Sequence, residues 1–422
     1  MSSSLNPVDS NHAFEVTHKD QNVAILSLHT SPFVQPGQGD SGGMNVYIRE
    51  LVSSLAHRGS QCSVYVRRWN NSLPDEVLIE PGVRLVHIDA GDPTLEKDVL
   101  CDVVDEFTDG VEKDLLHKPN VDVIHANYWL SGVSGHALKH RLGLPLVTTF
   151  HTLGRAKIFS GEHDSRDRVN KEHEVIDCSD VVVANSIAEA DQLKALYGAP
   201  EERIAVVPLG VEHAFFAPGN QEAARAALGL DNAPVVTFVG RLQPLKGVDL
   251  AVEMFAELGI DNAVLLIVGG ASGINGKSEV KKLQKRVEEL GVEQQVRLIA
   301  PQPHHILSTF YRASDMVIVP SKSESFGLVA LEAAACGTPV IAASVGGLQD
   351  LISHGETGYL VNERDPKLYA YYAREILTNP IHAAEMAMCA VEKARQYSWR
   401  KTSGQILSLY TSVNSRALVD CR

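Results

Sequence analysis

The sequence predicts an α/β protein with two doubly wound domains in tandem and a cleft between them. Continuous apolar runs of strand length recur from Val23 onward, a pattern typical of parallel strands that helices cover on both faces. Helix-length segments separate these runs, which indicates doubly wound sheets. The pattern starts again after a segment rich in Pro and Gly at 208–220, which we interpret as an interdomain linker.

The first domain is predicted at 1–208, and its strands are short apolar runs. They are VAILSLHTS from Val23, CSVYV (62–66), VRLVHI (83–88), VDVIHA (121–126), PLVTTFH (145–151), VVVANS (181–186) and IAVVP (204–208). Helices are expected between them, for example Met44 to Ala56 and Gly132 to His140. The carboxyl ends of such strands face the ligand site.

The second domain is predicted at 209–399, with a new series of apolar runs. They are PVVTFVGR (234–241), AVLLIVGG (263–270), VRLIA (296–300), MVIVPS (316–321) and TPVIAAS (338–344). The last helix, expected at Lys401 to Asn414 within about 400–422, should cross back and pack on the first domain.

Composition excludes several classes of protein. Apolar residues make up 44% and charged residues 21% of 422 residues, which argues against disorder and collagen-like repeats. The formal charge is −14 and no basic run occurs, so we expect no nucleic-acid partner. Neither a signal peptide nor an apolar stretch of about 18 residues is present, so we expect no membrane insertion and a cytoplasmic location.

The cysteines show neither CxxC nor CxxH spacing, which argues against a zinc site or a disulfide framework and favours a reducing compartment. They are Cys62, Cys101, Cys178, Cys336, Cys389 and Cys421.

A Gly-rich loop, QPGQGDSGGMN (35–45), matches G-x-G-x-x-G at Gly37, Gly39 and Gly42. A dinucleotide site is disfavoured, because that motif directly follows its strand and precedes an acidic residue by about 20 positions. The loop instead offers backbone N–H groups near a helix N-terminus, which suit an anionic or polar ligand. A surface turn is the alternative.

The second domain carries two cations and two acids with a phosphate-binding pattern. Arg241 and Lys246 follow its first strand in GRLQPLKG (240–247), where they can meet a diphosphate. Glu324 and Glu332 flank an FGL step that opens a helix, with Glu332 expected about two turns along it. An acid within the apolar run LVALEAAA requires a partner.

Three histidines, His29, His125 and His151, are expected to terminate parallel strands of the first domain and face the cleft. Arg155, Lys157 and Arg168 follow His151 and indicate an anion site for a second substrate. The sequence shows no nucleophile elbow directly after a predicted strand and no Walker loop of the form GxxxxGK[ST], so hydrolase and phosphoryl-transfer activities are disfavoured.

These motifs together resemble the retaining glycosyltransferases of family 4, whose GT-B fold has two Rossmann-like domains. The resemblance is carried by the E-x7-E element with SFGL, the GRL-x3-KG loop, GTPVIA (337–342) and GETGYLV (355–361). SLHTSP (27–32), QPGQGDSGGMNVYI (35–48), NYWLSG (127–132) and HTL (151–153) are similar to the D-inositol 3-phosphate glycosyltransferases. Those enzymes move N-acetylglucosamine from its UDP ester to 1D-myo-inositol 3-phosphate in mycothiol biosynthesis.

The resemblance implies a role for each matching residue. Arg241 and Lys246 would hold the donor diphosphate, Glu332 the ribose and Glu324 the sugar hydroxyls, while His151 would act near the anomeric carbon. Further donor contacts are implied for Gly43, Gln302, Phe326, Gly327 and Leu328. The implied acceptor residues are His29, Asp40, Asn45, Lys97, Tyr128, Thr152 and Arg168.

The implied substrates are a UDP-sugar and a phosphorylated polyol or sugar. Transfer would proceed with retention and without a required cofactor or metal, Mg²⁺ being possible but not needed, and the chain could form a homodimer. Two departures leave the substrates open. APQPHH (300–305) has Gln302 where these enzymes commonly have Arg, and HTLGRAK (151–157) is also similar to sucrose synthases and sucrose-phosphate synthases, which use fructose or fructose 6-phosphate. A sugar-nucleotide epimerase and a non-catalytic nucleotide-binding protein are the alternatives of other classes.

Overall fold

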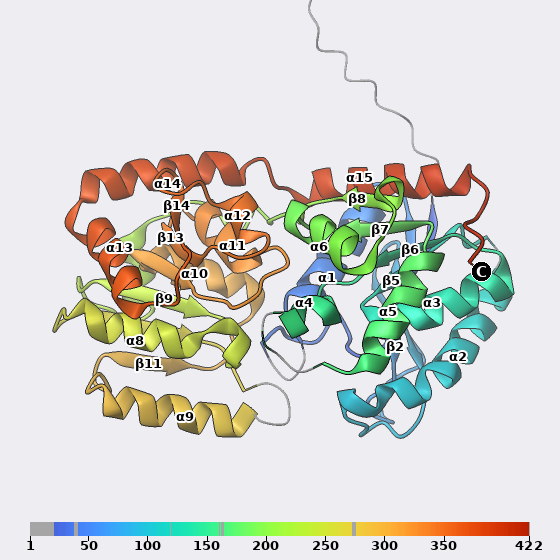
Figure 1. Cartoon of the computed structure of the whole chain (residues 1–422), viewed down its shortest axis with the longest axis horizontal. Helices are drawn as coiled ribbons and strands as arrows, with labels where there is room; N and C mark the ends of the chain where they lie inside the picture. Colours follow the sequence, from blue (N-terminus) through green and yellow to red (C-terminus); the bar gives the residue numbers. More distant parts are fainter. Residues whose placement is uncertain are drawn as a thin grey trace, which may run out of the picture.

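The computed structural model describes residues 21–37, 41–118, 120–159, 161, 164–271 and 276–421. Two α/β lobes lie side by side, and the last helix extends along the first lobe (Figure 1). The described residues form an eight-stranded sheet in the first lobe and a six-stranded sheet in the second. The predicted fold class is therefore confirmed.

The first sheet has the order β3-β4-β2-β1-β5-β6-β7-β8, and every neighbouring pair except β3 with β4 is parallel. Val23 of the central strand pairs with Cys62 on one side and Val123 on the other. The strands are β1 (Asn22–Leu26), β2 (Gln61–Arg67), β3 (Glu76–Glu80), β4 (Val83–Ile88), β5 (Val123–Asn127), β6 (Leu146–Thr149), β7 (Val181–Ala184) and β8 (Ile204–Val206).

Helices cover both faces of this sheet (Figure 1). They are α1 (Gly43–Ala56), η1 (Lys97–Val103), α2 (Val104–His117), α3 (Trp129–Leu142), α4 (Gly154–Phe159), α5 (Arg166–Cys178), α6 (Ile187–Tyr197), η2 (Glu201–Arg203) and α15 (Trp399–Asn414), with η marking 3-10 helices.

The second sheet has the order β11-β10-β9-β12-β13-β14, with parallel neighbours throughout. Its strands are β9 (Val235–Val239), β10 (Val264–Val268), β11 (Val296–Ile299), β12 (Met316–Val319), β13 (Val340–Ala343) and β14 (Gly358–Val361). Its helices are α7 (Gln221–Ala227), η3 (Pro244–Lys246), α8 (Val248–Leu258), α9 (Gly276–Glu289), η4 (His304–Ile306), α10 (Leu307–Ala313), α11 (Leu328–Ala335), α12 (Leu348–Leu351), α13 (Pro366–Thr378) and α14 (Pro380–Ala394).

Most strands are shorter than their apolar runs, because the chain leaves the sheet before the run ends. The first run was expected from Val23 through His29, yet β1 ends at Leu26, and the Ser27 hydroxyl donates to the Thr30 carbonyl in the turn that follows. Two strands, β3 and β14, were not predicted. β3 has mostly exposed side chains, so it lacks the continuous apolar pattern of the others.

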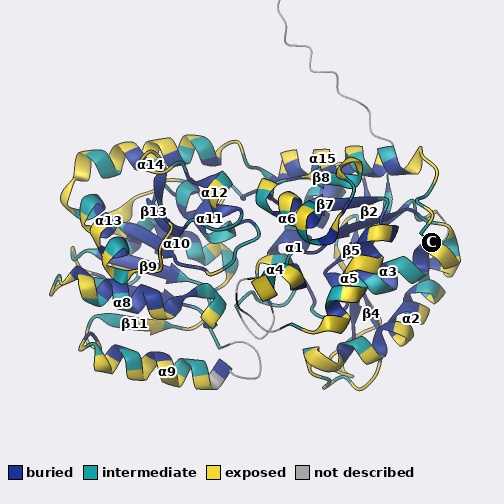
Figure 2. Ribbon diagram, viewed as in Figure 1, coloured by how far each residue is buried: buried dark blue, intermediate teal, exposed yellow. Residues whose placement is uncertain are grey.

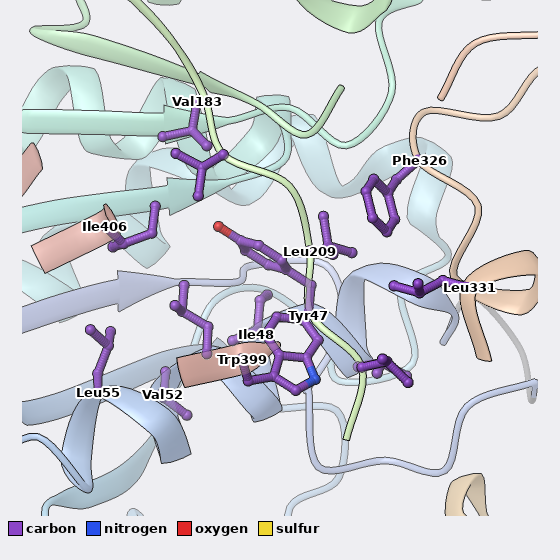
Figure 3. Close-up of a cluster of buried hydrophobic side chains, with 14 of the residues drawn as sticks. Tyr47, Ile48, Val52, Leu55, Val183, Leu209, Phe326, Leu331, Trp399 and Ile406 are labelled. Atoms are coloured by element: carbon purple, nitrogen blue, oxygen red, sulfur yellow. The ribbon is translucent and has the colours of Figure 1, made fainter. Parts of the chain in front are cut away.

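Buried residues follow the two sheets (Figure 2), and one core cluster spans both lobes. Figure 3 shows its centre, where Tyr47 of α1 lies near Trp399 of α15, with ring centroids 6.1 Å apart. Phe326 and Leu331 of the second domain belong to the same cluster. The α11 segment is therefore held against the first domain by buried apolar contacts.

The C-terminal segment returns to the first domain. α15 packs against α1, and the chain end then lies beside α3 (Figure 1). Cys421 is joined to Cys178, the last residue of α5, as a disulfide. The expectation that the cysteines form no disulfide is therefore wrong, because these two are 243 positions apart in sequence and meet only through the fold. Within the described segments, no helix combines the length and apolar character that crossing a bilayer requires.

Candidate active site

A cavity of about 880 Å³ lies between the domains, next to the carboxyl ends of their central strands. Most of the predicted site residues line it. From the first domain these are His29, Gly43, Lys97, Tyr128, His151 and Thr152, and from the second Arg241, Lys246, Gln302, Glu324, Phe326, Gly327, Leu328 and Glu332. Asn45 and Arg168 lie behind its wall, and Asp40 lies outside the described residues.

Lys246 and Glu324 form an ion pair at the second-domain side of the cavity. Lys246 Nζ lies 2.7 Å from Glu324 Oε2, which also accepts from the Ser321 hydroxyl at 3.1 Å. Lys246 ends the short helix η3, and Gly247 follows at φ +69°, where a Cβ would lie 2.2 Å from the Pro320 carbonyl oxygen. Glycine at this position therefore allows the cation-bearing loop to approach the Glu324 loop.

Glu332 is buried on α11 with two hydrogen-bond donors. The Tyr311 hydroxyl donates to one carboxylate oxygen at 2.9 Å, and His304 Nε2 lies 2.6 Å from the other. The helix begins at Leu328, so Glu332 lies just over one turn along it rather than two. The partners that an acid in an apolar helix requires are thus present, and the N-terminal amides of α11 lie at the cavity.

The Gly-rich loop of the first domain approaches the second domain closely. A Cβ at Gly42 would lie 3.4 Å from Arg241 Nε, and one at Gly43 would lie 3.6 Å from a Leu328 methyl group. Gln35 Nε2 also donates to the Pro301 carbonyl at 2.9 Å. The Gly-rich loop of the first domain therefore lies directly against Arg241 and Leu328 of the second domain.

His151 follows β6 and has a left-handed backbone with φ +61°. Asn127 Nδ2 donates to the His125 carbonyl, which leaves Asn127 Oδ1 to accept from His151 Nε2 at 2.9 Å. Nε2 therefore carries the proton in this arrangement. Burial, reinforced by His125, lowers the pKa of His151 to about 3, so the ring is neutral near pH 7.

The acceptor side of the cavity is built around Tyr128. Its ring stacks obliquely on His29, with centroids 4.3 Å apart, and Lys97 Nζ lies 4.9 Å from its centroid. Among the described atoms, His29 Nδ1 has no hydrogen-bond partner. Desolvation, followed by the charge of Lys97, lowers the pKa of His29 well below its usual value, so a neutral imidazole faces the cavity beside a cation.

Arg168 supports this side from behind. Its guanidinium donates to the Thr152 carbonyl and hydroxyl at 2.9 and 3.2 Å, and to the Tyr128 hydroxyl at 3.3 Å. It also pairs with Asp164 at 2.7 Å and with fully buried Glu172 at 2.8 Å. Arg168 is thus part of a buried network and is not a solvent-exposed cation.

The Asn45 side chain forms its hydrogen bonds with the segment that precedes α1. Its Nδ2 donates to the Ser31 carbonyl at 2.6 Å and the Thr30 hydroxyl at 3.0 Å, while its Oδ1 accepts from the Gly42 amide. The side chain therefore holds the Gly-rich loop to the turn that carries His29.

The expectation that His125 faces the cleft is wrong. It lies inside β5, where its ring contacts the Tyr410 hydroxyl at 2.6 Å and the Thr149 hydroxyl at 2.8 Å. Sequence analysis also missed Asn127, Ser325 and His304. Asn127 is the last residue of β5, a position that favours ligand sites. Ser325 and His304 carry no such signal, because their partners, His151 and Glu332, lie in distant segments of the sequence.

Family models match both halves of the chain. The model described as Glycosyltransferase Family 4 matches residues 41–215, and the model described as Glycosyl transferases group 1 matches residues 220–396. A D-inositol 3-phosphate glycosyltransferase of Thermobispora bispora is 43% identical over 93% of this chain and 95% of its own. This chain belongs to the family 4 glycosyltransferases. The protein of the same name from Acidothermus cellulolyticus is 44% identical, covering 92% and 89% of the two chains.

Solved structures agree with this assignment. A sucrose-phosphate synthase from Thermosynechococcus elongatus superposes with a TM-score of 0.87 at 30% identity, covering 93% of this chain and 99% of its own. Anabaena HepE in complex with UDP and glucose has a TM-score of 0.76 at 22% identity, covering 92% and 99%. The GT-B fold and the resemblance to D-inositol 3-phosphate glycosyltransferases are confirmed, and this glycosyltransferase is similar in fold to Anabaena HepE, which has also been solved in complex with UDP-glucose.

Proposed function

We propose that this glycosyltransferase transfers N-acetylglucosamine from its UDP ester to 1D-myo-inositol 3-phosphate, with retention at the anomeric carbon. The observation that carries the proposal is the presence of two groups of cations at one cavity. Arg241 and Lys246 line its second-domain side, and Lys97 lies on the other side with Arg168 behind it. A donor diphosphate and an acceptor phosphate require two such groups, and the names of the relatives agree with this acceptor.

On the donor side, Arg241 and Lys246 would bind the diphosphate together with the amides at the start of α11. Helix N-termini and Arg or Lys side chains are common phosphate ligands. Glu332 retains acceptor capacity for a ribose hydroxyl, because a carboxylate has about four lone-pair sites and only two donors contact it among the described residues. Gln302 at the rim would contact the nucleobase.

The reaction requires no protein nucleophile. The acceptor hydroxyl would attack the face from which UDP departs, and its proton would pass to the departing phosphate. Arg241, Lys246 and the α11 amides would stabilise the charge that develops on the diphosphate, which is preorganised electrostatic catalysis. Neutral His151, held by Asn127, would hydrogen-bond a sugar hydroxyl near the reacting carbon through Nδ1.

On the acceptor side, Lys97 would bind the phosphate directly. Arg168 would add positive charge at the phosphate and orient the Tyr128 and Thr152 hydroxyls, to which it donates hydrogen bonds. His29 lines the cavity beside Tyr128, and its ring would border the inositol. Asn45 would contribute by holding the loop.

A sucrose-phosphate synthase activity is the second candidate, favoured by HTLGRAK and by the 30% identity to that enzyme. UDP release distinguishes the two. UDP-N-acetylglucosamine and UDP-glucose should each be tested with inositol 3-phosphate, inositol, fructose 6-phosphate and fructose. The proposal expects release chiefly from UDP-N-acetylglucosamine with inositol 3-phosphate, whereas turnover only with a fructose acceptor would contradict it.

Metal independence is part of the proposal, because protein cations neutralise the diphosphate. Initial rates with and without added Mg²⁺, in buffer cleared of divalent cations, should differ little. A rate that depends strictly on Mg²⁺ would show that the cations of the cavity are insufficient.

A further inference from the structure

Two histidines and two cysteines converge far from the substrate cavity. His136 and His140 lie one turn apart on α3, Cys178 ends α5, and Cys421 lies in the segment after α15. His140 Nε2 is 2.8 Å from Cys421 Sγ and 3.3 Å from Cys178 Sγ, and His136 Nε2 is 3.6 Å from Cys421 Sγ. One ligand atom from each residue lies within 4.8 Å of all the others.

We propose that these four side chains bind one Zn²⁺ ion when the two cysteines are thiols. Two imidazoles and two thiolates are a complete tetrahedral ligand set for structural zinc. With Zn–S of about 2.3 Å and Zn–N of about 2.0–2.1 Å, neighbouring ligand atoms of a tetrahedral site lie roughly 3.3–3.8 Å apart. Two of the sulfur-to-nitrogen distances, 3.3 and 3.6 Å, fall in that range, and the third, 2.8 Å, is shorter.

A disulfide alone does not explain why two imidazoles lie beside its sulfur atoms. A Cys178–Cys421 bond requires no other side chain, yet both Nε2 atoms of an i, i+4 histidine pair lie at the sulfurs. Histidines four residues apart share one face of a helix and can bind the same metal ion. Because His140 is exposed and Cys421 is half-buried, the ion can reach the site from solution.

Conversion of the disulfide to a zinc site requires no redox group in the protein, because an external dithiol supplies the electrons. A dithiol reductant gives two electrons and two protons to the disulfide and becomes a disulfide itself. Zn²⁺ binding then releases the two thiol protons as two Zn–S bonds form, because thiolate is the ligand. Two thiolates and two neutral imidazoles leave the occupied site uncharged.

The site would anchor the C-terminus to the helices that carry the acceptor residues. Asp180, just after Cys178, accepts from the Val419 amide at 2.7 Å and pairs with buried Lys139 at 2.9 Å, so the chain end already follows this surface. Tyr128 precedes α3 and Arg168 is near the start of α5, at the ends opposite the cluster. The ion is therefore structural, and fixes one end of the helix pair whose other end borders the acceptor site.

Metal analysis of the full-length, untagged protein purified under reducing conditions tests the proposal. We expect about one zinc per chain, and its loss in both His140→Ala and Cys421→Ser. The second variant changes a residue near the chain end, so it tests the site without disturbing the core. Replacement by Co²⁺ should give sulfur-to-cobalt charge transfer and the intense visible bands of a tetrahedral ion.

Cys389→Ser and His173→Ala are matched controls, because both residues are exposed and outside the cluster; they should keep the zinc. Zinc-free reduced protein, or wild-type zinc content in both cluster variants, would overturn the proposal. So would a Cys178–Cys421 disulfide that persists in the reduced preparation. Zinc should raise the melting temperature of the wild type and leave that of Cys421→Ser unchanged.

Discussion

The Ser325 hydroxyl of the second domain donates a hydrogen bond to the backbone carbonyl of His151 in the first domain. This contact joins the loop before α11 to the residue that we place at the reacting sugar. It therefore couples the relative position of the domains to the geometry of the site.

Ser325→Ala should weaken this contact between the two domains. Loss of one hydrogen bond costs about 0.5–1.5 kcal/mol, so we expect kcat/KM to fall about two- to tenfold, with little change in melting temperature. Steady-state kinetics and thermal unfolding measure the two effects. Ser408→Ala, on the exposed face of α15, is the control and should behave as wild type.

His151→Ala should reduce kcat far more than UDP affinity. The hydrogen bond that the sugar hydroxyl donates to Nδ1 of this ring strengthens as positive charge develops at the sugar, so its contribution is to the transition state. Calorimetric UDP binding and saturation kinetics separate the two quantities. A variant with weak UDP binding and normal kcat would instead make His151 a donor-binding residue.

Lys246→Ala should weaken donor binding without unfolding the protein. A charge-assisted hydrogen bond is worth about 1.5–3 kcal/mol, or roughly ten- to more than hundredfold in affinity. The variant also leaves Glu324 without its cation, which adds repulsion toward the diphosphate. Lys367→Ala, an exposed lysine of α13, is the control, and equal UDP affinity in both variants would exclude Lys246 from the donor site.

Lys97→Ala should reduce the preference for inositol 3-phosphate over inositol by roughly tenfold or more while leaving UDP affinity nearly unchanged, because it removes a charge-assisted contact. Arg168→Ala should erase much of the same preference. It should also lower stability, since buried Glu172 loses its ion-pair partner. Ratios of kcat/KM for the two acceptors measure the preference, and equal use of both by the wild type would refute a phosphate site.

Acid should destabilise the protein through its buried histidines. Burial lowers the pKa values of His125 and His151 to about 3, below about 6.5 in the unfolded chain. The unfolded state therefore binds more protons below about pH 6.5, and the free energy of unfolding falls as pH decreases toward 3. The slope approaches about 1.4 kcal/mol per pH unit for each histidine.

Urea unfolding between about pH 7 and about pH 5 measures this slope. His125→Gln should flatten it, because glutamine can hydrogen-bond at this site but does not titrate. His173→Gln, on the exposed face of α5, should leave the slope unchanged. Identical slopes in all three proteins would show that His125 titrates normally.

The sequence by itself determined the two doubly wound sheets, because strands covered on both faces require continuous apolar runs, which can be recognised in the sequence. Most of the site residues that it predicted also line the cavity, since the carboxyl ends of parallel strands gather at one edge of each sheet. Mostly exposed β3 lacked that signal and was missed.

Only the tertiary structure decided which side chains form hydrogen bonds, ion pairs and the disulfide with one another. Glu332 accepts hydrogen bonds from Tyr311 and His304. Arg168 forms ion pairs with Asp164 and Glu172. His125 lies inside the first domain and not at the cleft. Cys178 and Cys421 meet across 243 positions, beside two histidines from a third segment. Local spacing cannot encode such contacts, because they depend on how helices and chain ends pack after the sheets have formed.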